Sequence, residues 1–138
     1  MHDSDSTPEY LVISRGQWDE GLAPEVIQAA IDRFYVWHDE LVAQGKMIAG
    51  QRLAPQTKLV SKTGITDGPF TETKEVIGGY WFIRAASLAE AAQIAADNPC
   101  LACGLAFEIR PIEPKKASAF DTTTETPGRR THNRLPGI

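Results

Sequence analysis

The densest group of polar side chains suited to acid–base chemistry is the stretch TDGPFTETKE, residues 66–75. It supplies Asp67, Glu72 and Lys74 as candidate catalytic residues, because desolvation and neighbouring charges at a cleft tune a carboxyl group for general acid or base catalysis. A second interpretation is a plain turn, since Gly68 permits a positive φ, Pro69 fixes φ and Asp67 accepts hydrogen bonds from nearby backbone amides. The stretch lacks the spacing of a phosphate-binding loop.

Other side chains suited to ligand binding are spread along the chain. Trp18 lies in the connection after the first expected strand, where an indole can stack on a ligand. His38 shares a helical stripe with Phe34 and Leu41, where a histidine is either a hydrogen-bonded core residue or a functional group. The candidate ligand-binding residues are Trp18, His38, Arg52, Phe70, Tyr80, Glu108 and Arg110.

The two cysteines, Cys100 and Cys103, are spaced as a C-x2-C pair. A zinc site needs two more ligands, and a thioredoxin-like pair precedes a helix, whereas this pair follows a helix and precedes a strand. We interpret both as structural thiols. Because the chain offers no coherent set of metal ligands, we predict no metal and no cofactor.

Hydrophobic periodicity predicts the elements that position these residues. An amphipathic helix is expected from Pro24 to Gly45, and a second helix begins after Ser87, which forms a capping box with Glu90. Strands rich in β-branched and aromatic residues are expected over 10–13, 47–53, 80–83 and 105–110, with a short hairpin joining 59–60 to 65–66.

This order predicts an α+β fold, a ferredoxin-like antiparallel sheet with two helices on one face. Residues 10–13 and 80–83 are apolar at both parities, so both faces of those strands favour burial. We therefore expect a homodimer whose sheets face each other across a cavity, a dimeric α/β barrel, with Glu108 and Arg110 in or beside the cavity. The alternative is that the C-terminal tail covers the second face.

Length and composition limit the function. The 138 residues suit one domain, which we place at residues 9–113, between a flexible N-terminus (1–8) and a disordered or loosely attached tail (114–138). A net charge of −4 argues against nucleic acid as a ligand. The polar, acidic start and the lack of a long apolar run predict a soluble cytoplasmic protein that does not contact a membrane.

Four sequence segments resemble the YCII-related family, in its DGPF branch: TDGPF at 66–70, ETKE at 72–75, GGY at 78–80 and EIRPI at 108–112. The resemblance covers residues 9–113 and implies the dimeric α/β barrel expected above. One YCII-type relative is a dehydrochlorinase acting on a chlorinated aromatic ring, and DGPF proteins are often associated with extracytoplasmic-function sigma factors. A catalytic His and Asp pair has been proposed in YCII-type relatives; here the region of the histidine falls near Arg33 or Phe34, and that of the aspartate near Asp97.

Two hypotheses of function remain open. In the first, the chain binds a small organic molecule between the sheets, and the resemblance implies metal-free elimination or isomerisation of a small organic acid or phenol. In the second, the chain is a non-catalytic regulatory module that binds a metabolite or a sigma factor, with Arg129, Arg130 and Arg134 in a basic tail. Whether the chain is an enzyme is not decided by the sequence.

Overall fold

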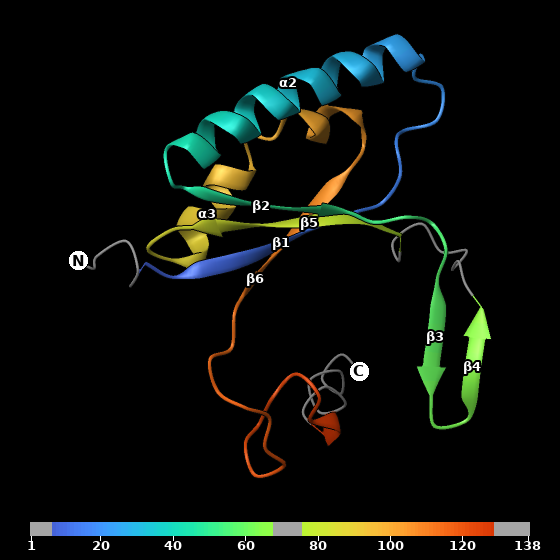
Figure 1. Cartoon of the computed structure of the whole chain (residues 1–138), viewed down its shortest axis with the longest axis vertical. Coiled ribbons are helices and arrows are strands. Elements are labelled where there is room, and N and C mark those ends of the chain that lie inside the picture. Colours follow the sequence, from blue (N-terminus) through green and yellow to red (C-terminus); the bar gives the residue numbers. More distant parts are fainter. Residues whose placement is uncertain (1–6, 68–75, 129–138) are drawn as a thin grey trace, which may run out of the picture.

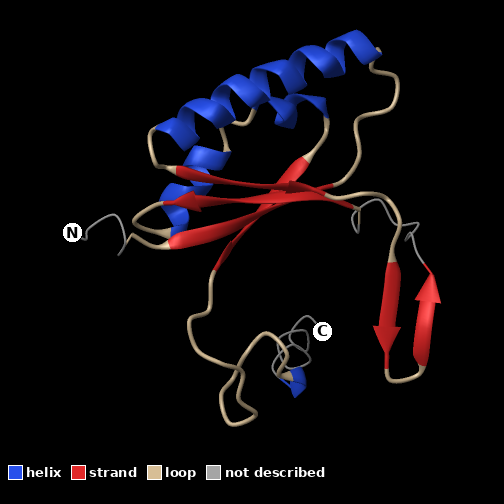
Figure 2. Cartoon of the chain, viewed as in Figure 1, coloured by secondary structure: helices blue, strands red, loops and turns tan. Residues whose placement is uncertain are grey.

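The centre of the molecule is a four-stranded antiparallel sheet with two helices on one face (Figures 1 and 2). The computed structural model describes residues 7–67 and 76–128. The strands, in their order across the sheet, are β2 (Met47–Arg52), β5 (Ile77–Arg84), β1 (Glu9–Arg15) and β6 (Ala106–Pro111). The helices are α2 (Pro24–Ala43) and α3 (Leu88–Ala95). The α+β fold predicted from the sequence is confirmed.

The core lies between this sheet and its two helices. Val12 in β1 and Ile83 in β5 are fully buried, and Trp81 is almost fully buried. From above them, α2 contributes Phe34, Trp37 and Leu41, and α3 contributes the small residues Ala91 and Ala95. Alanines on the inner face let α3 approach the sheet closely. One face of every central strand is therefore sealed from water.

The long helix α2 begins and ends at the residues that its sequence indicates. Pro24 stands in the first turn, where its missing N–H costs nothing, and Ala23 provides no side-chain cap. The helix ends before Gly45, whose φ of 77° is a left-handed conformation that glycine adopts without strain. The predicted span of residues 24–45 agrees with this.

The second helix is capped as expected and is followed by an element that was not predicted. The Ser87 hydroxyl accepts from the Glu90 amide at 3.1 Å, and the Glu90 carboxylate accepts from the Ala86 amide at 2.6 Å. After α3, the chain forms a short 3-10 helix, η2 (Pro99–Cys103), capped by the Asn98 side chain. It contacts α2 and places both cysteines in a second buried cluster.

The predicted hairpin is present as β3 (Lys58–Ser61) and β4 (Gly64–Asp67). It projects from the body on the side of the sheet opposite α2 (Figure 1). All eight strand residues are exposed, Val60 and Ile65 at 72% and 67%. The hairpin therefore presents apolar side chains without burying them in this chain.

The segment after β6 projects on the same side of the sheet. Residues 112–128 leave the sheet and form turns held by local hydrogen bonds, such as the one from the Phe120 amide to the Ser118 hydroxyl. Figure 1 shows this segment standing away from the sheet, and Phe120 is 97% exposed. The described part of the tail thus leaves the sheet uncovered. Within the described ranges, no helix is both long and apolar enough to span a bilayer.

Candidate functional site

The uncovered face of the sheet is apolar and aromatic along two rows of paired residues. Strand register places Gln51, Tyr80, Ile13 and Glu108 in one row, and Ile48, Phe82, Leu11 and Arg110 in the next. These residues alternate with the core residues of the same strands, so they point away from the helices. The Tyr80 and Phe82 rings meet edge to face, 6.0 Å apart. We call these eight residues the open face.

A cluster of charges borders the open face along β6. Glu108 accepts a hydrogen bond from Arg15 Nε at 2.5 Å through one carboxylate oxygen and from Arg110 Nη1 at 3.0 Å through the other. One carboxylate therefore holds two guanidinium groups. At the far end of β1, Glu9 and Arg84 form a looser pair at 3.5 Å.

The arginines keep Glu108 ionised. The hydrogen bond from Arg15 is the main cause that lowers the pKa of the Glu108 carboxyl below its ordinary value, and Arg110 adds to the effect. Partial burial acts in the opposite direction and does not outweigh them. A carboxylate held in this way is a weak base and a strong hydrogen-bond acceptor. The ionised Glu108 carboxylate is therefore suited to holding Arg15 and Arg110 in place.

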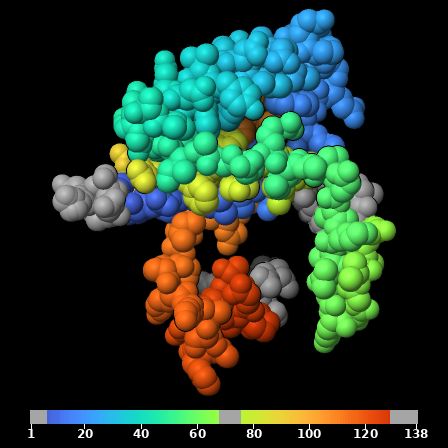
Figure 3. Space-filling model, in the orientation of Figure 1, coloured from blue at the N-terminus to red at the C-terminus, as the bar shows by residue number. Residues whose placement is uncertain are grey.

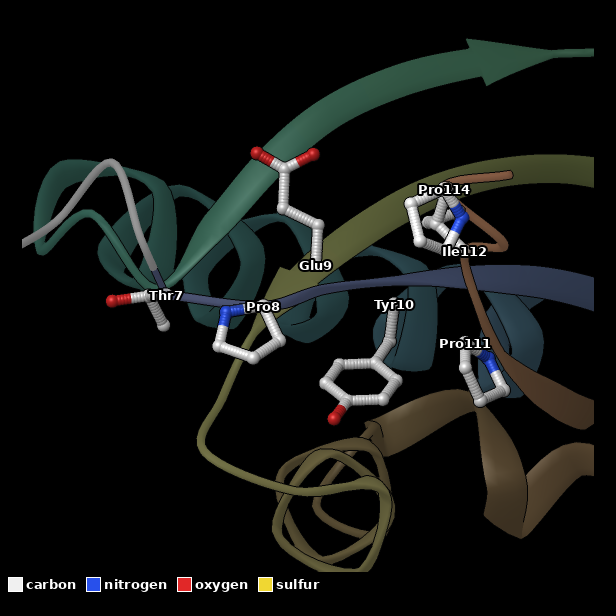
Figure 4. Close-up of a pocket in the computed structure, with 7 residues that line it drawn as sticks. All are labelled: Thr7, Pro8, Glu9, Tyr10, Pro111, Ile112 and Pro114. Atoms are coloured by element: carbon white, nitrogen blue, oxygen red, sulfur yellow. The ribbon is translucent and has the colours of Figure 1, made fainter. Parts of the chain in front are cut away.

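A shallow pocket of about 410 Å³ lies at the end of the sheet where β1 begins and β6 ends. Figure 4 shows its walls, which come from the start of β1 and the segment just after β6. The lining residues are Thr7, Pro8, Glu9, Tyr10, Pro111, Ile112 and Pro114. Its prolines give it a rigid rim, and Glu9 supplies the carboxylate among its described lining residues.

Three of the predicted ligand-binding residues come together on the open face: Tyr80, Glu108 and Arg110. Arg52 does not join them. It pairs with Gly79, the neighbour of Tyr80, and successive strand residues face opposite sides of the sheet, so Arg52 lies at a position of the other face. Sequence reasoning missed Arg15. Its contact with Glu108 joins residues 93 positions apart, so only the strand register reveals it.

Two other predicted residues lie on the helix side. Trp18 packs in the second cluster with Ala30 and the cysteines. The His38 side chain is 12% exposed, with its ring 5.4 Å from Phe34 and 6.3 Å from Trp81. Its Nδ1 atom is 3.1 Å from the Asp39 carboxylate. These positions favour the core interpretation of His38 that the sequence left open.

Among the described residues, the proposed His and Asp pair of YCII-type relatives has no counterpart on the open face. Phe34 packs on Trp81 in the core, and Arg33 is exposed on α2. Asp97 follows α3 and is exposed on the helix side. The matching regions of the chain therefore do not bring a histidine and an aspartate to the open face.

The stretch with the candidate catalytic residues is only partly described. Asp67 ends β4, and its exposed carboxylate pairs with Lys58 Nζ at 2.5 Å. This pair joins the two strands of the hairpin, which agrees with a structural role for Asp67. Phe70, Glu72 and Lys74 lie outside the described residues.

The cysteines are buried and are free thiols. Burial is the main cause that raises the pKa of the Cys100 thiol; the nearby Cys103 adds to this, and Arg33 opposes it. A raised pKa lowers the fraction of reactive thiolate at neutral pH. Across the described ranges, no group of three or more His, Cys, Asp or Glu side chains is placed to hold a metal ion.

Comparison with known proteins identifies the family of this chain. A model of the YCII-related domain matches residues 9–116. The chain belongs to the YCII-related domain family. An uncharacterized protein of Rhizobium meliloti is 33% identical over 88 residues, which cover 61% of this chain and 68% of that protein. The DGPF and EIRPI segments thus predicted the family correctly.

Among solved structures, this YCII-related chain is similar to the 5-chloro-2-hydroxyhydroquinone dehydrochlorinase of Burkholderia phenoliruptrix, determined in complex with 2,5-dihydroxybenzoquinone. The match has 18% sequence identity and a TM-score of 0.42, and it covers 83% of this chain and 99% of that one.

Proposed function

We propose that this YCII-related protein binds a small organic molecule on the open face, between two copies of the chain whose sheets face each other. The observation that carries the proposal is the open face itself, where the half-buried Tyr80, Phe82, Leu11 and Ile13 lie on the side of the sheet away from the helices, beside a charged cluster. An apolar surface with a few convergent polar groups is the usual composition of a ligand site.

A second copy is the partner that this surface favours. Uncovered apolar patches of this kind are uncommon on monomers and mark contact surfaces. The hairpin and the C-terminal segment flank the open face on its own side, and the molecule is hollowed between them (Figure 3). Because a lone two-stranded hairpin is marginally stable in water, the exposed Val60 and Ile65 favour burial against another chain.

The described residues favour binding over catalysis. Glu108 is the carboxylate within the two rows of the open face, and its arginine partners make it a weak base. Acid–base activity of lyase or isomerase type would therefore depend on residues 68–75, including Glu72 and Lys74, in keeping with the sequence hypothesis. Binding is therefore the function that the described residues support.

The test measures mass and ligand binding on the same samples. Light scattering after size-exclusion chromatography should give the dimer mass for the wild-type chain and the monomer mass for Phe82→Asp, because a charge in a buried apolar interface is costly. Val36→Asp, on the exposed outer side of α2, is the control and should remain a dimer. A monomeric wild-type chain that no small aromatic compound stabilises against heat would contradict the proposal.

The alternative function, a regulatory module associated with an extracytoplasmic-function sigma factor, gives a different result. Such a module uses its surface to bind a protein and does not need a small molecule between two sheets. This alternative would be favoured if a purified sigma factor bound the wild-type chain but not Phe82→Asp, and if no small molecule bound to the chain.

A further inference from the structure

We propose that the C-terminal segment, residues 112–128, is an arm that crosses to the second copy of the chain, where its Phe120 packs against Ile48 and Phe82 of the partner subunit. This inference rests on the proposed function, because it names a residue that one copy adds to the open face of the other. Three observations on the described residues support it: the internal order of the segment, the exposure of Phe120, and the corner of the sheet from which the segment leaves.

The C-terminal segment is held in shape by its own hydrogen bonds. The Phe120 amide donates to the Ser118 hydroxyl at 3.1 Å, and the Asp121 amide donates to the Ser118 carbonyl at 3.3 Å. Further along, the Thr123 amide donates to the Thr126 hydroxyl at 2.8 Å. All these bonds stay within the segment. The turn that carries Phe120 is therefore formed before any partner is bound.

Phe120 has the form of an interface anchor. Its side chain is 97% exposed, the highest value among the large apolar residues that the structure describes. Aromatic side chains dominate the energy of protein interfaces, because they bury a large apolar area while few torsions are immobilised. Since the backbone of this turn is already fixed, docking the ring would need little further ordering.

The hairpin and the C-terminal segment leave the sheet at opposite corners. The hairpin follows the end of β2, at Arg52, and the C-terminal segment follows the end of β6, at Pro111. These strands are the two edges of the sheet and run in opposite directions, so their ends are diagonally opposed. Both segments project on the side of the open face (Figure 1). Two corners are not taken by either segment: the start of β2 (the β2 corner) and the start of β6 (the β6 corner).

Twofold symmetry would bring the partner's segments to these two corners. Sheets that pack face to face keep their strands nearly aligned, so the twofold axis between them runs along or across the strands. With either axis, the partner's hairpin and C-terminal segment reach the β2 and β6 corners, and no two segments collide. Each open face is then walled by segments of both copies.

The chemistry of the two corners selects the place of Phe120. Near the β2 corner the open face presents the half-buried Ile48 and Phe82, which are paired across the strands. Near the β6 corner lies the ion pair of Arg15 and Glu108. A phenyl ring over that pair would take charges out of water, whereas over the β2 corner it meets apolar and aromatic side chains. The partner's Phe120 therefore belongs at the β2 corner, and the axis runs along the strands.

Photochemical cross-linking tests which chain Phe120 touches. The amino acid p-benzoylphenylalanine, placed at Phe120 of the full-length chain, bonds to a neighbouring C–H group under ultraviolet light. Irradiation should give a covalent dimer on a denaturing gel, and mass spectrometry should map the link to β2 or β5. Mixing unlabelled chains with nitrogen-15-labelled chains would show that the link joins two copies. Val36, exposed on the outer side of α2, is the control position and should give no covalent dimer.

Substitutions test the same contact through the dissociation constant of the dimer. Phe120→Ser should raise it about tenfold or more, because one buried aromatic side chain is lost. Ile48→Ser should also raise it, and the double change should raise it by less than the product of the two single effects, since both remove one contact. Val36→Ser is the control and should leave it unchanged. Sedimentation equilibrium would measure all variants, with circular dichroism to confirm folding.

The outcomes separate this inference from the proposed function. A wild-type dimer whose cross-links stay within one chain, or whose dissociation constant is the same in Phe120→Ser, would overturn the arm and leave ligand binding between two open faces intact. A link from Phe120 to β6 of the other copy would overturn the contact with Ile48 and Phe82. A monomeric wild-type chain that no small aromatic compound stabilises would overturn both the arm and the proposed function.

Discussion

At the scale of single residues, Glu108 determines how the charged edge of the open face is organised. It accepts from Arg15 and Arg110 through different oxygens, so one carboxylate orients an arginine of the neighbouring strand β1 and an arginine of its own strand β6. Without this carboxylate, two positive side chains would lie together on one edge and repel each other.

Replacing Glu108 with Gln should therefore destabilise the chain at neutral pH. Because the folded-state pKa of Glu108 is lowered, its ion pairs stabilise the fold above the ordinary carboxyl pKa of 4.5, and this contribution is lost as the pH falls through the lowered value. For a partly exposed network we expect about 1 kcal/mol at pH 7. Urea unfolding at pH 7 and at pH 3 would measure it.

The control for this prediction is Glu20→Gln, a change of the same chemistry on an exposed loop residue. It should leave the free energy of unfolding unchanged at both pH values. Equal destabilisation of Glu108→Gln at pH 7 and pH 3 would show that the side chain acts through packing and not through its charge.

At the scale of elements, the edge strand β2 depends on a bulge opposite Trp81. Ile48 pairs with Phe82 and Gln51 with Tyr80, so Ala49 and Gly50 together lie opposite one residue. A Cβ atom on Gly50 would stand 1.9 Å from the Tyr80 carbonyl oxygen and 2.9 Å from the Trp81 Cα atom. Backbone atoms of a central strand cannot move aside cheaply.

Gly50→Ala should consequently cost more than about 2 kcal/mol of stability, because β2 must separate from β5 or the bulge must change. Gly78→Ala is the matched control in the same sheet: its Cβ would meet the Ser14 hydroxyl at 3.8 Å, an ordinary contact. It should change stability by less than about 0.5 kcal/mol. Chemical unfolding of the two variants, side by side, would decide whether the bulge is required.

The elements themselves could largely be predicted from the sequence, because their signals are local. β-Branched and aromatic content marks β1 and β5, while Pro24, Gly45 and Ser87 mark helix ends. The 3-10 helix η2 was not predicted, since five residues after Asn98 carry no periodic pattern.

The site was harder to predict because it depends on register and rotation. Tyr80, Glu108 and Arg110 could be placed by strand parity, which their sequence positions give directly. Arg15 required the pairing of β1 with β6, and His38 and Trp18 required the rotation of α2 and the path of the loop before it. Side-chain type alone does not contain that information.

At the scale of the whole molecule, the two faces of the sheet are covered unequally. Both helices protect one face of the sheet, while the hairpin and the C-terminal segment extend beyond the other without covering it (Figures 1 and 3). A symmetric pair of chains would bring each open face against its copy and place each hairpin beside the partner. The dimer proposal therefore accounts for the open face and for the exposed hairpin with one contact.

The double change Val60→Ser and Ile65→Ser tests this account, since the two residues are a cross-strand pair on one side of the hairpin. In this chain both are exposed, so their loss should leave the free energy of unfolding of the separated chain nearly unchanged. In the dimer, burial of two such side chains is worth about 1.5–3 kcal/mol each, so the dissociation constant should rise at least about tenfold. Sedimentation equilibrium of wild type and variant would measure it. An unchanged dissociation constant would place the hairpin outside the interface, and the dimer contact would then consist of the open face alone.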